Sequence, residues 1–250
     1  MSNIWTIAKR EYAHYFITPI AYVLAITILL VIGIVFVTDL GTFTLNAMQS
    51  FGRAPNVQNV TGVFVFMLML TVPAVTMRTI SEEARSGTLE LLLTAPIRDF
   101  ELVAGKWLAG LLFVLTILAV TLIYPLILNS LVEPGIDSMQ VVAAYFGSIL
   151  AAAAFLGLGV GISAVFPNQV AAFFVTLVTF ITLWWLVGIP TQIIQSSGAL
   201  SVFRYLDMPS HFYPSFNSGI LRLADIVYFL SLAALGLFIG TTAVEARRWS

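Results

Sequence analysis

Three residues in the last third of the sequence could form a hydrolytic site by their types alone. Asp207, Ser210 and His211 supply a carboxylate, a hydroxyl and an imidazole, the three groups of a serine-hydrolase triad. All three lie in the single segment 207–211, however, and no Gly-x-Ser-x-Gly turn presents the serine. A local role is favoured instead, with Ser210 capping a short helix and His211 forming nearby hydrogen bonds. Neither His211 nor His14 indicates a metal site.

A nucleotide site is the second chemistry to consider. A P-loop needs the pattern GxxxxGK followed by Ser or Thr, because its backbone amides surround the phosphates. Gly105 and Lys106 form the only Gly-Lys pair, with Phe100 at the place of the first glycine and Trp107 at the place of the hydroxyl residue. The sequence therefore predicts no catalytic residue and no bound cofactor. With 0 Cys, thiolate chemistry is excluded as well.

Charged residues gather in one short stretch, SEEARSGTLELLLTAPIRDFE, at Ser81 to Glu101. Ser86 and Gly87 interrupt the preceding helix, and Pro96 ends a second short helix that begins at Thr88. Three leucines share one face of this helix while an acid projects elsewhere; they are Leu89, Leu92 and Leu93, with Glu90. Such a helix can offer an apolar contact to a soluble partner, or it can rest on lipid headgroups. The residues alone leave both interpretations open.

The elements that position these residues are predicted to be membrane helices. The chain is 60% hydrophobic and 9% charged, whereas soluble domains are about 45–50% apolar and about 25% charged. About 20 apolar helical residues cross a bilayer, and the alternating pattern of barrel strands is absent. We therefore expect an all-α integral membrane protein, a single transmembrane domain over 1–250, with six transmembrane helices. Their expected ranges are 17–37, 61–77, 103–128, 141–166, 170–188 and 226–244.

Two further segments are expected to lie near the membrane surface. Residues 1–16 place apolar side chains at helical spacing before the first span, which predicts a short interfacial helix. The 189–221 region is long and partly apolar, and it predicts one or two short helices on the outer side.

The distribution of basic residues predicts the orientation. If the N-terminus is cytoplasmic, that side carries eight of the 11 basic residues: Lys9, Arg10, Arg78, Arg85, Arg98, Lys106, Arg247 and Arg248. The other side carries Arg53, Arg204 and Arg222. The positive-inside rule therefore predicts both termini in the cytoplasm. A net charge of -1 argues against a nucleic-acid partner.

Two segments carry a resemblance to a known family. The order EEARSGTLELLLTAPI, followed by Lys106, resembles the loop after the second helix in membrane subunits of ATP-binding cassette (ABC) exporters of the type-2 class. The segment YLDMPSHFYPSFNSGILRLADIVYFLSL is similar to the last outer loop and sixth helix of that class, particularly of permeases like the gliding-motility component GldF. The resemblance covers essentially the whole chain.

The resemblance implies a role for each of these regions. Residues 86–96 would be the coupling helix, which docks on a separate ATPase, and the N-terminal helix would be the elbow helix. The coupling residues implied are Glu82, Glu83, Arg85, Ser86, Gly87, Thr88, Leu89, Glu90, Leu92, Leu93 and Pro96. The outer gate region implied by the resemblance contains Asp207, His211, Phe212, Arg222 and Asp225.

The resemblance also implies partners that the chain lacks. ATP and Mg would be bound by a separate ABC ATPase, expected in two copies, and two permease copies would enclose the pathway. A homodimer is preferred over a pair with a related permease, and an accessory membrane or periplasmic subunit could join it. The expected location is the bacterial inner membrane, and the expected cargo is hydrophobic or amphipathic.

Two rival functions remain to be weighed. An ion-coupled carrier usually places ionisable residues at mid-membrane, but the central portions of the six predicted spans contain none. Arg222 and Asp225 lie three residues apart at the outer end of the sixth span, a spacing that predicts a pair on the helix surface. A membrane-embedded enzyme or assembly factor is the second rival, and it would depend on the weak triad described above.

Overall fold

The protein is a bundle of long helices. The computed structural model describes residues 2–45, 56–86, 97–133, 135–190 and 197–248. Within these ranges the chain contains no strand, and six helices are long and apolar enough to cross a membrane. These spans are Pro19–Leu45, Gln58–Arg85, Asp99–Leu131, Ser138–Val165, Gln169–Leu186 and Leu223–Arg248. The prediction of an all-α protein with six spans is confirmed. The bounds differ most in the first two spans, which run to Leu45 and Arg85, past the expected ends at 37 and 77.

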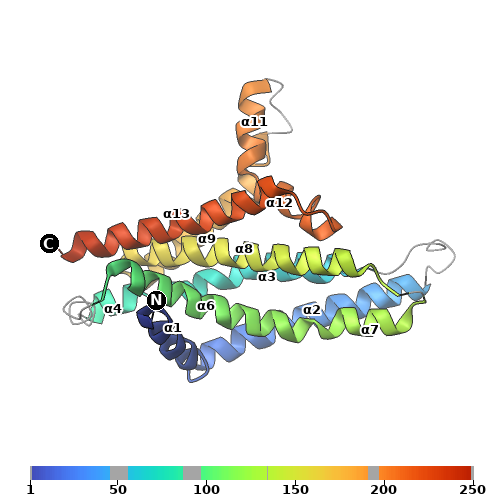
Figure 1. The fold of residues 1–250 in the computed structure, drawn as a ribbon, viewed down its shortest axis with the longest axis horizontal. Coiled ribbons are helices and arrows are strands. Elements are labelled where there is room, and N and C mark those ends of the chain that lie inside the picture. The colour runs from blue at the N-terminus through green and yellow to red at the C-terminus, as the bar shows by residue number, and fades with distance from the viewer. Residues whose placement is uncertain (1, 46–55, 87–96, 134, 191–196, 249–250) are drawn as a thin grey trace.

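The elements follow one another along the chain as Figure 1 labels them. The first four are α1 (Ser2–Tyr15), α2 (Pro19–Leu45), α3 (Gln58–Thr76) and α4 (Ser81–Ser86). The middle of the chain contains α6 (Asp99–Thr121), α7 (Ile123–Leu131), α8 (Ser138–Val165), α9 (Gln169–Ile181) and the π-helix η1 (Thr182–Leu186). The last elements are α11 (Ser197–Leu206), α12 (Met208–Phe212), the 3-10 helix η2 (Phe216–Ser218) and α13 (Leu223–Arg248).

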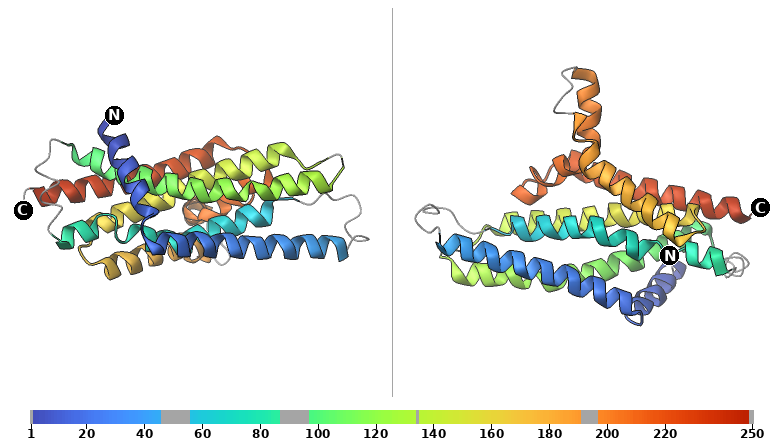
Figure 2. Two further views of the ribbon diagram at one scale, coloured as in Figure 1. Left: turned by 90° about the horizontal axis from the view of Figure 1, so that it is seen from below. Right: turned by 180° about the vertical axis from the view of Figure 1, so that it is seen from behind.

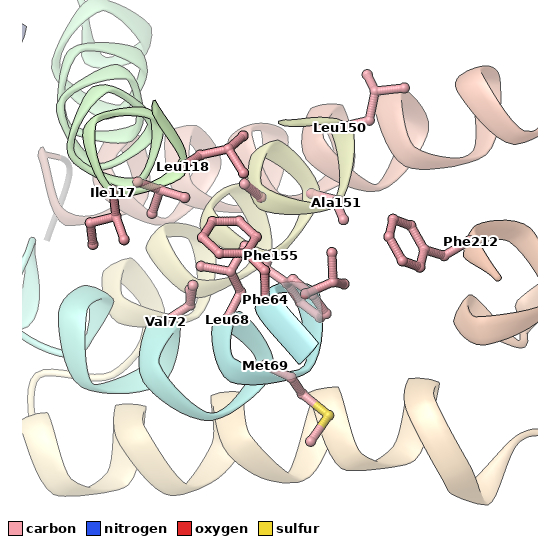
Figure 3. Close-up of a cluster of buried hydrophobic side chains, with 14 of the residues drawn as sticks. Phe64, Leu68, Met69, Val72, Ile117, Leu118, Leu150, Ala151, Phe155 and Phe212 are labelled. Carbon is pink, nitrogen blue, oxygen red and sulfur yellow. The ribbon is translucent and has the colours of Figure 1, made fainter. Parts of the chain in front are cut away.

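Helix α8 is the centre of the bundle, with α3, α6, α9 and α13 packed around it. Its small residues allow this arrangement, since a Cβ added to Gly157 would lie 2.9 Å from the Cα of Ala233 in α13. Helix backbones can approach closely only where side chains are small. Beside this close contact of α8 and α13, the core is filled by larger side chains. Among them are Phe64, Leu68 and Phe155, which face one another in Figure 3.

A proline interrupts the third span where the sequence allows a bend. Helix α6 ends at Thr121 and α7 begins at Ile123, with Pro125 in its first turn. Proline has no N–H, so the carbonyl four residues earlier loses its helical donor. That carbonyl belongs to Thr121, and the hydroxyl of Tyr145 in α8 donates to it at 2.9 Å. The break is therefore stabilised by a neighbouring helix, as buried backbone groups in a membrane require.

The ends of the bundle differ in character. The N-terminal part of α6, the helix α4 and the C-terminal end of α13 lie at one end, called the termini end below (Figures 1 and 2). Helix α11 projects away from the bundle (Figure 1), α12 lies against α13 and η1, and η2 packs against α8. The short helices predicted for 189–221 are thus present in its described part.

Candidate functional sites

The N-terminal helix α1 is held firmly against α6 at the termini end. A Cβ added to Gly105 would lie 2.7 Å from Cγ2 of Ile7, so this glycine is what allows α1 to cross so closely. The hydroxyls of Tyr12 and Thr116 lie 2.9 Å apart, and the ring of Tyr15 stacks on Phe113 at 5.0 Å between centroids. Helix α1 is therefore fixed along its whole length to the third span.

A buried lysine joins three elements at this end. Lys106 of α6 is 3% exposed, and its Nζ lies 2.8 Å from Oε1 of Glu83 in α4 and 3.6 Å from Oε1 of Glu11 in α1. Arg10 adds a second cation to Glu11 at 2.9 Å. We refer to Lys106, Glu83, Glu11 and Arg10 as the Lys106 cluster. A charge this buried is stable only when paired, so the cluster fixes the relative positions of α1, α4 and α6.

The electrostatics of α1 reflect this cluster. Burial opposes the ionisation of Glu11, but Lys106 and Arg10 beside it outweigh that effect, and the pKa of Glu11 lies below its ordinary value. Burial, together with the charge of Glu11, raises the pKa of Tyr15. Glu11 is therefore ionised at neutral pH, and Tyr15 keeps its proton.

The residues on either side of the predicted coupling segment 86–96 are attached to the central bundle. At its start, the backbone N–H groups of Ile80 and Ser81 donate to Oγ of Ser163 in α8, at 3.2 and 3.3 Å. At its end, Asp99 forms an ion pair of 2.8 Å with Arg248 in α13. The chain on both sides of the segment is therefore attached to helices of the central bundle, α8 before it and α13 after it.

The predicted coupling residues fall into two groups. Gly87, Thr88, Leu89, Glu90, Leu92, Leu93 and Pro96 lie outside the described residues. Of the others, Glu82 and Arg85 are exposed, Ser86 ends α4, and Glu83 points inward to Lys106. Glu83 thus contacts another element of this chain, unlike the exposed Glu82 and Arg85, and the docking role of the segment stays a prediction.

A second polar cluster lies where α12 meets α13. Nδ1 of His211 is 2.6 Å from Oδ1 of Asp225, and Nε2 is 2.9 Å from the backbone carbonyl of Tyr205. The imidazole stacks on the ring of Tyr228 at 4.0 Å between centroids, and Tyr205 meets both rings edge-on. Both His211 and Asp225 are buried.

Both ring nitrogens of His211 have a partner. A carbonyl oxygen only accepts, so Nε2 donates to the carbonyl of Tyr205. Nδ1 faces the carboxylate of Asp225. Through this contact His211 joins α12 to α13, the sixth span.

The structure corrects two predictions for this region. Asp225 pairs with His211 and not with Arg222, which is exposed beside it. Ser210 does not cap α12: its hydroxyl donates to the carbonyls of Asp207 and Arg204, and Asp207 occupies the N-cap position.

The remaining predicted gate residues take different environments. Phe212 is 0% exposed and belongs to the core. Asp207 lies against the end of the fifth span, since a Cβ on Gly188 would be 2.8 Å from its Oδ1. Burial raises the pKa of Asp207. The structure therefore brings His211 and Asp225 into contact while Arg222 stands apart at the surface, and a gate role for these residues stays a prediction.

Sequence reasoning missed a third set of polar contacts. Oγ1 of Thr61 in α3 donates to Oδ1 of Asn217 in η2 at 2.6 Å, and the amide of Asn217 donates to the carbonyl of Gln58 at 3.1 Å. An asparagine in an apolar loop was the available signal, because a buried amide needs partners. These bonds attach η2 to the second span, as His211 attaches α12 to the sixth.

In the part of the chain that the structure describes, no three His, Cys, Asp or Glu side chains gather as metal ligands would.

Comparison with known proteins gives one match that covers nearly the whole chain. The model of a family described as ABC-2 family transporter protein matches residues 5–244. A search of curated proteins gives no match. The matched range contains the first five spans, the sixth span as far as Val244 and most of α1, so it takes in both polar clusters.

Proposed function

Because the chain belongs to the ABC-2 transporter family, we propose that it forms the translocation pathway as a dimer and is driven by a separate ATPase. The observation that carries this proposal is the family match over 5–244, which includes the SEEARSGTLELLLTAPI segment. The chain is a membrane transport subunit, and its sequence contains no P-loop. ATP and Mg would then bind the partner, expected in two copies.

The proposed coupling step uses the contacts of the Lys106 cluster and of Ser163 at the termini end. ATP binding would bring two ATPase subunits together and move the segment 86–96 docked on each. The Lys106 cluster would carry that movement from α4 to α6 and α1, and Ser163 would carry it to α8. The spans would then reorient around the seam between two permease copies. The two rivals, an ion-coupled carrier and a membrane enzyme, have no comparable observation in their favour.

The finer assignments are also part of the proposal. We place both termini in the cytoplasm, in a bacterial inner membrane, on the eight-to-three distribution of basic residues. The cargo is proposed to be hydrophobic or amphipathic, and the kinship with GldF-like permeases depends on the segment from Tyr205 to Leu232.

The experiment is purification of the tagged chain from its native membrane in mild detergent, followed by mass spectrometry of what accompanies it. The proposal expects a P-loop ATPase in stoichiometric amount, and vesicles containing both proteins should hydrolyse ATP. Isolation of the chain alone, under conditions where a known ABC-2 transporter stays assembled, would count against the proposal and in favour of the ion-coupled carrier or the membrane enzyme.

A further inference from the structure

A cavity of about 740 Å³ opens beside the Lys106 cluster. Its walls come from the second half of α1, the first turns of α2, the end of α3 and α4, with Lys106 contributed by α6. This volume falls within the range of about 300–1,000 Å³ typical of small-molecule sites.

The polarity of the cavity changes along its length. On the wall formed by α3 and α4, the lining residues recur at helical spacing, from Ala74 and Val75 through Arg78 and Thr79 to Glu82 and Glu83. On the opposite wall the lining runs from Leu24, Ala21, Ile20 and Ile17 to His14, Glu11 and Arg10. Both walls are apolar toward the middle of the spans and charged toward the termini end. This order matches the cross-section of an amphiphile that stands in one bilayer leaflet.

Two guanidinium groups line the charged end. Lys106 is engaged by Glu83 and Glu11, so its charge is already balanced. Arg78 is exposed, and within the described part of the chain no hydrogen bond or ion pair is formed by its side chain. Arg10 pairs with Glu11 at 2.9 Å, but its side chain is 62% exposed and so can reach a further anion. Guanidinium groups bind phosphate through paired hydrogen bonds, and these two approach the cavity from different walls.

We propose that this cavity binds a phosphate-bearing amphiphile, with Arg78 and Arg10 contacting the phosphate and an acyl chain lying along Ile20, Ala21 and Ala74. A second copy of the chain is a poorer occupant, because interface cores are depleted of charged residues and this lining is rich in them. The amphiphile is either a lipid of the bilayer or the transported cargo, since both offer the same chemistry.

The test uses the full chain in nanodiscs made with phosphatidylglycerol that bears a photoreactive group on its acyl chain. After illumination, mass spectrometry identifies the labelled peptides. Labelling should concentrate on the peptides containing Ile17–Leu24 and Ala74–Val75. Replacing both arginines, Arg10→Gln with Arg78→Gln, should reduce this labelling about tenfold, because two charge-assisted hydrogen bonds are lost. Lys9→Gln is the matched control, since Lys9 is an exposed neighbour on α1 that does not line the cavity. Photoreactive diacylglycerol, which lacks the phosphate, should label wild type as weakly as phosphatidylglycerol labels the double variant.

Three results would overturn the proposal. One is equal labelling of all lipid-facing helices, and another is labelling that the arginine variant leaves unchanged. The third uses the absence of native cysteine: efficient disulfide formation between two copies of Ile20→Cys would place a second chain on the cavity.

The source of the amphiphile is decided by adding the partner ATPase and MgATP. If labelling of the cavity peptides falls during ATP turnover, the amphiphile is cargo. If that labelling is unchanged, the amphiphile is a bilayer lipid. Both results support the binding site. Binding in the absence of the ATPase does not depend on the proposed function, so failure of the ATPase capture would leave this test intact.

Discussion

Replacing Lys106 with methionine should destabilise the protein by more than any exposed charge would. The variant leaves Glu83 and Glu11 facing an apolar side chain, with side-chain exposures of only 19% and 24%. Removing one member of a fully buried pair costs about 3–5 kcal/mol, whereas exposed pairs contribute at most about 1 kcal/mol. The lysine is buried and its partners are partly exposed, so the expected cost is about 2–3 kcal/mol. At this chain length the melting temperature should fall by about 5–10 °C.

The assay is thermal unfolding of the purified chain in detergent, followed by tryptophan fluorescence. Lys9→Met is the control, because Lys9 is exposed on α1, and it should change stability by less than about 0.5 kcal/mol. A double-mutant cycle with Glu83→Gln should be non-additive by about 1–2 kcal/mol, since the pair is in direct contact. Equal effects of Lys106→Met and Lys9→Met, or strict additivity in the cycle, would refute the structural role of the cluster.

Three further substitutions test other contacts by the same melting assay. Gly161→Ala should lower the free energy of unfolding by about 1–3 kcal/mol, because its Cβ would collide with the backbone of α13. Gly41→Ala, with open space around it, should be neutral or stabilising. Equal effects would contradict the close packing of α8 on α13. His211→Leu should cost about 3–5 kcal/mol by leaving its buried carboxyl partner unpaired, while His14→Leu at an exposed site should cost less than about 0.5 kcal/mol. Asp207→Asn should stabilise the protein at pH 7, because a raised folded-state pKa means that ionisation above the ordinary value of 3.8 opposes folding; the gain should disappear below pH 3.8.

The fold could be predicted largely because each membrane helix can be recognised from the composition of a short stretch of sequence. Each span is an apolar run of the length that a bilayer demands, and turns such as Phe166–Gln169 are marked by proline and asparagine. In the structure Asn168 caps α9 by accepting from the N–H of Val170 at 2.9 Å. Helix ends were less predictable, since the first and second spans run to Leu45 and Arg85, past the expected ends at 37 and 77.

The polar contacts could be predicted only where both partners are close in the sequence. Spacing suggested a pair between Arg222 and Asp225, but His211 reaches the same carboxylate from another helix. Lys106 was recognised as part of a motif, yet its burial against Glu83 and Glu11 depends on how α1 crosses α6 at Gly105. Such contacts are set by tertiary packing, and a single sequence does not contain that information.

The central claim, that the segment 86–96 docks on an ATPase, is tested most directly by a photoreactive amino acid in place of Leu92. Illumination of native membranes followed by mass spectrometry of the adduct should identify a P-loop ATPase. The same probe at Ser138 is the control. Ser138 begins the fourth span, at the end of the bundle opposite the termini end, and should give no such adduct. If the probes at 92 and 138 both react only with lipid, the segment is an interfacial helix, and coupling to an ATPase through it is contradicted.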